Sequence, residues 1–164
     1  MVKTLAKALI FQFYRFFLAR KGVIIHHHAV ISNVDFLGKA VIEPFCRLCG
    51  SPKISIGDNF YMNVGCHILG DIAIGNDVQI GPKTVIWGRD HGMKIGQLIR
   101  EQSHVCAPVT IRDDVWVGAN VTILKGVEIG KGAVIGAGAV VTQNIPEYAI
   151  AVGNPARVVK YREQ

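Results

Sequence analysis

The 164-residue sequence lacks the motifs that several common chemistries require. It has no Gly-x-Ser-x-Gly segment, so a serine nucleophile of the hydrolase type is unsupported. Its four cysteines include one Cys-x-x-Cys pair, Cys46 and Cys49, without a second pair at zinc-finger spacing. We therefore expect ordinary thiols there rather than a metal centre. No secretory leader is evident, and a disulfide framework is not expected.

The sequence also lacks an apolar run long enough to span a bilayer. Residues 1–21 are rich in apolar and aromatic residues, but Lys3, Lys7 and Arg15 interrupt them. Arg15 stands where a signal peptide needs an unbroken apolar core. The pattern predicts a short amphipathic helix over residues 1–22. This helix either packs on the base of the remaining fold or makes a peripheral contact with a membrane through its aromatic face.

Acidic residues are too few to balance the basic ones, and the formal net charge is +6. The basic residues gather in residues 1–21 and again at Arg157, Lys160 and Arg162. A nucleic-acid-binding chain would interleave basic and aromatic residues in one stripe, so no nucleic-acid partner is expected. An anionic ligand or a membrane surface accounts better for charge at the two ends.

What the sequence does contain is a repeat: aliphatic residues recur every six positions, with one interruption. Six is a multiple of the two-residue strand period, so three hexads can close one triangular coil of roughly eighteen residues. Stacked coils would pair as parallel strands, whereas a β-sandwich would space its strands by about eight to twelve residues. We therefore predict an all-β parallel β-helix. The repeating positions are Ile56, Met62, Ile68, Ile74, Ile80, Ile86, Ile111, Val117, Ile123, Ile129, Ile135 and Val141.

The first part of the repeat is irregular. Within residues 23–53 the six-residue phase is kept at Ile25, Ile31 and Leu37, but prolines disturb it. Terminal repeats are commonly atypical, so we expect imperfect first coils there. At the corners between strands, asparagine tolerates the left-handed conformation, which suits Asn59, Asn76 and Asn120.

The β-helix core is expected over residues 54–145, with a basic tail over residues 146–164. The hexad register is lost over residues 92–108, which indicates an inserted loop on one face of the solenoid. Half of the residues are hydrophobic, and an open-ended β-helix exposes strand edges. Together these features favour an oligomer.

His91 is the last residue before the inserted loop. An imidazole in that place can act as a general base near neutral pH. The run His26-His27-His28 is not expected to bind a metal, because consecutive strand residues point to opposite faces.

Several segments together carry a family resemblance: the hexads, the histidine before the loop, DVWVG at 114–118, VIGAGAVVT at 134–142 and GNPARV at 153–158. Over residues 54–160 the chain resembles the hexapeptide-repeat acyltransferases, in the branch of maltose, galactoside and polysaccharide O-acetyltransferases. The resemblance implies a left-handed parallel β-helix, which is an exception to the usual crossover handedness. It also implies a homotrimer with active sites at subunit interfaces, and acetyl coenzyme A (acetyl-CoA) as the co-substrate.

The resemblance also implies roles for particular residues. His91 matches the catalytic base, which would take the proton from a sugar hydroxyl as that oxygen attacks the thioester. The backbone N–H of Ala119, or of a neighbour, would stabilise the oxyanion. Glu101 lines the site from the loop, orients the base, or is a solvated loop charge. The acceptor-binding matches are Tyr61, Asn63, Asp71 and Trp116; the matches near the donor are Ala119 and Ala137 for pantetheine, and Thr142, Gln143, Arg157 and Lys160 for the nucleotide phosphates.

The chain departs from the family pattern in three places. Gln143 stands where a lysine is common, and Gly65 replaces an asparagine usual in the sugar acetyltransferases of this branch. A short basic aromatic segment replaces their long N-terminal helical domain, which is more like acetyltransferases of polysaccharide and lipopolysaccharide biosynthesis. The acceptor is therefore less defined by the sequence than the donor is.

The sequence thus predicts a cytoplasmic acetyltransferase, peripheral to the membrane if residues 1–21 bind it, that modifies a sugar hydroxyl during surface-polysaccharide or lipopolysaccharide assembly. One alternative is N-acetylation of an amino-sugar nucleotide, and another is a non-catalytic structural β-helix. A zinc hydratase on the same fold would need three converging histidines. The coils offer only His67 and His91, with His104 in the loop, so no metal is expected.

Overall fold

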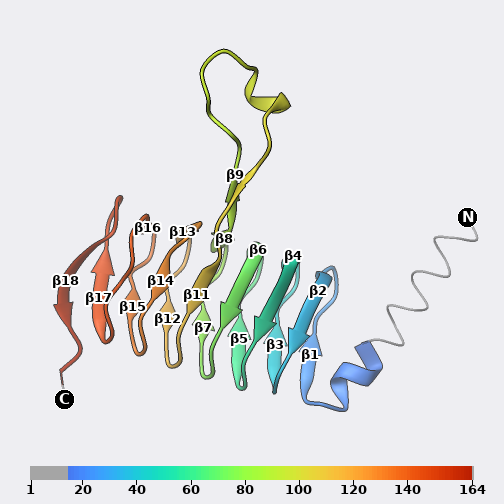
Figure 1. Ribbon diagram of the computed structural model, residues 1–164. Coiled ribbons are helices and arrows are strands. Elements are labelled where there is room, and N and C mark those ends of the chain that lie inside the picture. The colour runs from blue at the N-terminus through green and yellow to red at the C-terminus, as the bar shows by residue number, and fades with distance from the viewer. Residues whose placement is uncertain (1–14, 164) are drawn as a thin grey trace, which may run out of the picture.

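The computed structural model describes residues 15–163 of the chain. These residues wind into a three-sided parallel β-helix whose coils stack from one end to the other (Figure 1). Strands at the same place in successive coils pair side by side in parallel. The predicted all-β parallel β-helix of hexapeptide coils is confirmed.

Face 1 of the solenoid is one sheet that runs its whole length. Its last strand is antiparallel to its neighbour and closes the C-terminal end. In spatial order the strands are β1 (Val23–Ile25), β3 (Ala40–Ile42), β5 (Phe60–Met62), β7 (Gln79–Ile80), β12 (Trp116–Val117), β15 (Val134–Ile135), β17 (Ala149–Val152) and β18 (Arg157–Tyr161).

Faces 2 and 3 form a second sheet, because three long strands bend from one face onto the other. These are β2 (Val30–Phe36), β4 (Arg47–Ile56) and β6 (His67–Ile74). Face 2 continues in β8 (Val85–Trp87), β13 (Thr122–Leu124) and β16 (Val140–Val141), and face 3 in β11 (Val109–Ile111) and β14 (Glu128–Ile129).

Two of the three edges of the prism are important for the site. Corner A joins face 1 to face 2 and comprises residues 63–66, 81–84, 118–121 and 136–139. Corner B joins face 2 to face 3 and comprises residues 70–71, 88–108, 125–127 and 142–144.

The predicted aliphatic positions form the core. All twelve are at most 4% exposed, and they stack in register from coil to coil. On face 1, for example, Met62 pairs with Ile80, Ile80 with Val117 and Val117 with Ile135. Each such side chain contributes about 1.5–3 kcal/mol when it is buried rather than exposed, so the ladders supply the main stabilisation of the fold.

The first coils depart from the six-residue phase. The phase predicted at Leu37 is wrong, because Leu37 is 74% exposed and Phe36 pairs with Ile56 in its place. The pairing of β2 with β4 shifts register between Ser32 and Val34. The bend between faces 2 and 3 is therefore one residue shorter here than a regular hexad requires.

The predicted left-handed corner residues are confirmed at Asn59 and Asn120, which have φ angles of 55° and 53°. The prediction is wrong for Asn76, since Asp77 takes the left-handed position instead, with φ of 57°. The side chain of Asn76 has another role: its Oδ1 accepts a hydrogen bond of 2.8 Å from the backbone N–H of Asp58 in the preceding coil.

The single long interruption of the solenoid is an extended loop at corner B (Figure 1). It begins in β9 (Arg89–Asp90), returns in the antiparallel β10 (Val105–Cys106), and carries the short 3₁₀ turn η1 (Ile99–Glu101) near its tip. The loop projects away from the prism, so its residues beyond β9 and β10 take no part in the coil stack.

The first coil contacts a short helical segment. Residues 15–19 are helical, Leu18 is buried, and the Arg15 guanidinium donates a hydrogen bond to the carbonyl of Ile25. Most of the helix predicted over residues 1–22, including the membrane contact considered for it, lies in residues 1–14, outside the described residues. Within residues 15–163, no helix reaches the length and apolarity that crossing a bilayer would need.

Candidate functional site at corner B and the facing edge

The base of the loop is anchored to the following coil. Asp90, the last residue of β9, forms an ion pair of 2.9 Å with Lys125. Asp90 also pairs with Val105 of β10, and the Gly92 N–H donates to the Ser103 carbonyl across the same hairpin at 3.1 Å. These contacts hold His91 at a defined place, one residue beyond the regular strand.

The imidazole of His91 is exposed and lies beside that of His104, with ring centroids 4.7 Å apart. Among residues 15–163 its side chain has no hydrogen-bond partner. An imidazole in this arrangement can accept a proton from a hydroxyl brought to it. The proximity of His104 was missed by the sequence analysis, since it depends on the antiparallel return of the loop.

Other predicted residues share corner B with His91. Asp71 lies at the bend of β6, one coil before the loop, and is exposed. Thr142 and Gln143 follow β16, two coils after the loop, and are also exposed. Corner B therefore places an imidazole, a carboxylate and two polar side chains along one edge of the prism.

A second group of predicted residues lies along corner A. The Asn63 Oδ1 accepts the backbone N–H of Val64 at 2.8 Å, which fixes the amide at the start of its corner. Ala119 is half-buried and Ala137 exposed, and the Gly138 N–H donates to the Ala119 carbonyl at 2.8 Å. The small side chains leave the backbone of this edge accessible to an extended ligand.

Face 1 carries the two predicted aromatic residues. The Tyr61 hydroxyl donates to Glu43 Oε1 at 3.3 Å, and burial together with the nearby Glu43 carboxylate raises the pKa of the phenol, so it stays protonated. Trp116 is 58% exposed and borders a hollow of about 490 Å³. The same hollow is bordered by Arg162, which bonds Asp114 at 2.8 Å.

The remaining predicted residues are peripheral in the single chain. Arg157 and Lys160 lie exposed on β18 at the C-terminal end. Glu101 is the last residue of the η1 turn, and Figure 1 shows this turn near the tip of the loop. Among the described residues, the Glu101 carboxylate has no hydrogen bond or ion pair with His91.

One chain does not bring these groups together. Corner A and corner B are the two opposite edges of face 2, so His91 and Ala119 stand on either side of the strands β6, β8 and β13. A ligand that touched both residues would have to bridge two edges of the same prism, or lie between two prisms.

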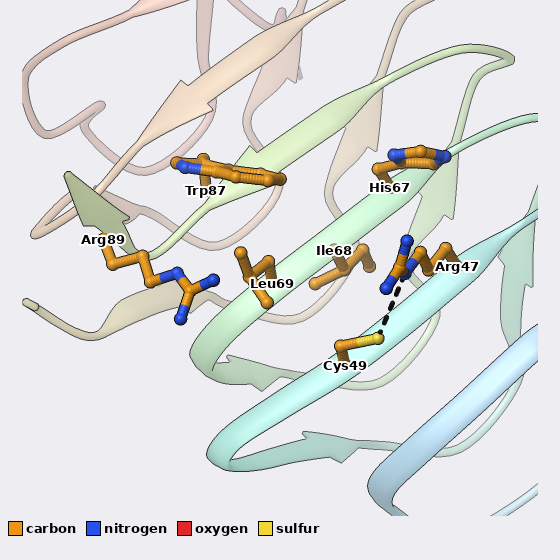
Figure 2. A pocket seen from close by; sticks show the side chains of 7 residues that line it. All are labelled: Arg47, Cys49, His67, Ile68, Leu69, Trp87 and Arg89. Atoms are coloured by element: carbon orange, nitrogen blue, oxygen red, sulfur yellow. Dashed lines mark hydrogen bonds between the residues drawn. The ribbon is translucent and has the colours of Figure 1, made fainter. Parts of the chain in front are cut away.

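A hollow on face 2 lies between these edges and was not found from the sequence. Its volume is about 160 Å³, and Figure 2 shows two guanidinium groups, an indole ring and an imidazole around it. The signal in the sequence is the outward register of the strands, which puts Arg47 beside His67 and Leu69 beside Trp87. The lining residues are Arg47, Cys49, His67, Ile68, Leu69, Trp87 and Arg89.

The cysteines are free thiols, as expected. Cys46 and Cys66 are buried in neighbouring coils, where their Sγ atoms donate to the carbonyls of Asn63 at 3.0 Å and Gly81 at 3.1 Å. The hydrogen bond between the two thiols and their burial raise the pKa of Cys66, so it stays protonated and unreactive. In residues 15–163 no group of three potential ligands is arranged to hold a metal ion.

Known proteins share this architecture. Residues 108–143 match the family model of the bacterial transferase hexapeptide, six repeats. A maltose O-acetyltransferase from Clostridium difficile is 33% identical, with 90% of this chain and 73% of that chain covered and a TM-score of 0.65. A hexapeptide-repeat acetyltransferase from Vibrio cholerae, solved with acetyl coenzyme A, is 29% identical, with 93% and 79% covered and a TM-score of 0.71.

Relatives with curated descriptions are also described as acetyltransferases. The galactoside O-acetyltransferase of Escherichia coli is 37% identical over 123 residues, which are 74% of this chain and 60% of that protein. The chain spans 60–65% of the length of the first curated relatives that it matches.

The coil stack and the family-model match define a β-solenoid protein of the hexapeptide-repeat class. The identities and coverage above place the chain within it: it belongs to the hexapeptide-repeat acyltransferase family. The resemblance recognised in the sequence is thereby confirmed.

Proposed function

We propose that this protein transfers an acetyl group from acetyl-CoA to a hydroxyl of a sugar, with His91 as the general base. The observation that carries the proposal is the place of His91, exposed and anchored at the base of the inserted loop in a family of acyltransferases. Relatives that act on maltose and galactosides, and a neighbour solved with acetyl-CoA, support the choice of donor and acceptor class.

The chemistry needs one proton transfer and one displacement. The His91 imidazole removes the proton of the acceptor hydroxyl while that oxygen attacks the thioester carbonyl. The acetyl C–S bond breaks, coenzyme A leaves as a thiolate, and the acetyl–oxygen bond forms. A backbone N–H of corner A, at Ala119 or beside it, stabilises the oxyanion. Because both substrates are held in line, no covalent enzyme intermediate is required.

The proposed binding residues lie along corners A and B and on face 1. Tyr61, Asn63, Asp71 and Trp116 bind the acceptor, since amide and carboxylate groups hold sugar hydroxyls and an aromatic ring packs on a sugar face. The pantetheine arm lies along Ala119 and Ala137, and the nucleotide phosphates meet the C-terminal end. There the polar and basic side chains are Thr142, Gln143, Arg157 and Lys160.

The active protein is a homotrimer in this proposal. His91 and the small residues of corner A stand on opposite edges of one prism, so a neighbouring copy completes the site. Exposed apolar side chains on the loop support such a contact. Each of these side chains is more than half exposed, which is costly unless another surface covers it; they are Met93, Ile95, Leu98 and Ile99.

The test is thiol release from acetyl-CoA against a panel of sugars and amino-sugar nucleotides. We expect acetylation of a hydroxyl, and a loss of at least about 100-fold in kcat for His91→Ala, because general-base catalysis contributes that much. His27→Ala is the matched control, since His27 is an exposed histidine on the first coil and should retain full activity.

Three results would contradict the proposal. Acetylation of the amino group alone would assign the enzyme to amino-sugar nucleotides. An unchanged kcat in His91→Ala would show that His91 is not the general base. A complete absence of transfer, with no thermal shift on adding coenzyme A, would leave a non-catalytic structural β-helix.

A further inference from the structure

The hollow on face 2 has the character of a binding site (Figure 2). Its walls are two short rows of outward side chains on paired strands. Arg47 is in register with His67, and Leu69 is in register with Trp87. The buried Ile68 lies beneath, between the two rows. These side chains are therefore set by the regular strands of the prism, whereas Arg89 reaches the hollow from β9 at the base of the inserted loop.

The hollow is positively charged. Arg47 lines it from β4 and Arg89 from β9, and no aspartate or glutamate is among its lining residues. Neither arginine takes part in any of the five ion pairs of the described residues. The one hydrogen bond of their guanidinium groups in this part of the chain runs from Arg47 Nε to Cys49 Sγ at 3.4 Å.

Two guanidinium groups without a carboxylate partner are suited to an anion. Each offers planar, always charged N–H donors that match the oxygens of a phosphate or a carboxylate. Trp87 adds an apolar ring, 37% exposed, between Leu69 and Leu124 of the flanking strands. Charged donors beside an aromatic platform suit an anionic group carried on a sugar ring.

The position of the hollow connects it with the acceptor. Asn63 at corner A and Asp71 at corner B flank the face 2 segment of β6, and the outward residues of that segment, His67 and Leu69, line the hollow. At about 160 Å³ it is smaller than the roughly 300–1,000 Å³ of a complete ligand pocket. It is therefore sized to hold one part of a larger ligand.

We infer that this hollow is an anchoring subsite for an acceptor sugar that carries a negative charge, with Arg47 and Arg89 binding its phosphate or carboxylate and Trp87 packing on its ring. The inference rests on the proposed function, since it names the class of acceptor. It distinguishes this chain's acceptor from the neutral sugars in the names of its maltose and galactoside relatives.

Binding without the donor tests the inference independently of catalysis. Calorimetric titration of the full chain with glucose 1-phosphate, UDP-N-acetylglucosamine, glucuronic acid and glucose compares two phosphate sources, one carboxylate source and a neutral sugar. We expect at least one anionic ligand to bind about tenfold or more tighter than glucose, and less tightly as salt rises. Which one binds identifies the source of the charge; equal binding of all four ligands overturns the inference.

Variants locate the site. Arg47→Gln and Arg89→Gln should each raise the Kd for the anionic ligand by about 10- to 100-fold and leave glucose binding unchanged. Arg112→Gln is the control, because it removes the same charge at a position outside the hollow, directly after β11, where Arg112 pairs with Glu128. If Arg47→Gln and Arg89→Gln bind the anionic ligand like wild type, the inference fails. It fails as well if they only dissociate the oligomer in light scattering, since the hollow is then a contact between copies.

Acetylation assays separate this inference from the proposed function. If wild type, Arg47→Gln and Arg89→Gln acetylate neutral sugars at the same rate, the inference of an anionic acceptor is wrong. The proposed acetyltransferase activity would still stand. If the anionic ligand binds through the two arginines but no sugar is acetylated, the proposed acetyltransferase activity is wrong. The anion-binding site would still stand.

Discussion

Thr84 is the one polar side chain, apart from the thiols, that is fully buried in the described part of the chain. Its hydroxyl donates to the Gly118 carbonyl at 2.9 Å and accepts the backbone N–H of Val121 at 3.2 Å. Residues 118–121 belong to the first coil after the inserted loop. The hydroxyl therefore joins the two coils that the insertion separates in sequence.

Thr84→Val keeps the shape of the side chain but leaves a buried N–H and a buried carbonyl without a partner. Each unsatisfied group costs about 1–3 kcal/mol, so the variant should unfold at clearly lower denaturant concentration. Thr84→Ser is the control, because it retains the hydroxyl and loses only a methyl group. A Thr84→Val protein as stable as wild type in urea unfolding would show that the two bonds add nothing.

Single residues also show what the sequence could reveal. The aliphatic ladder was predictable, since a six-residue period leaves one inward position per face, and all twelve residues are buried. The inward column of Cys46, Cys66 and Thr84 was not predictable, because its role depends on carbonyls of the neighbouring coil. Leu37 was mispredicted because a corner one residue shorter changes which side chain points inward.

The inserted loop is an element with its own internal order. The Gln102 side chain donates to the carbonyls of Lys94 at 2.9 Å and Gln97 at 3.0 Å, and its Oε1 accepts the Lys94 N–H at 2.8 Å. One amide thus ties three parts of the loop together. The loss of register over residues 92–108 indicated an insertion, but these bonds follow from its folded path and could not be read from the pattern.

Gln102→Ala removes three hydrogen bonds from the loop and none from the prism. At about 0.5–1.5 kcal/mol for each bond, opening of the loop should increase at least about tenfold. Trypsin should then cleave faster at Lys94 and Arg100, and acetyl transfer should fall, while Tm stays unchanged. Gln97→Ala is the control, since its side chain makes a single long bond of 3.3 Å to the Glu101 carbonyl. Equal cleavage rates in Gln102→Ala and wild type would contradict this account of the loop.

In the whole molecule, the candidate site is divided between two edges. Sequence matching proposed His91, Asn63 and Ala119 as candidate site residues, but a linear pattern does not say which edge each residue occupies. The coil order does: His91 lies at corner B, while Asn63 and Ala119 lie at corner A. The proposed trimer resolves this division, because corner B of one copy can face corner A of the next.

Mixed oligomers test that arrangement. His91→Ala removes the base, and Ala119→Trp fills the backbone edge on which the donor is proposed to lie, so each variant alone should be inactive. The two variants are then refolded together in equal amounts. About a quarter of the interfaces will combine an intact His91 from one copy with an intact Ala119 from its neighbour, because each residue is intact in half of the copies. Activity should therefore return to about a quarter of wild type, whereas two inactive variants mixed without refolding provide the control. Mixed trimers that form, as shown by differently tagged copies purifying together, and yet stay inactive would place the whole site within one chain.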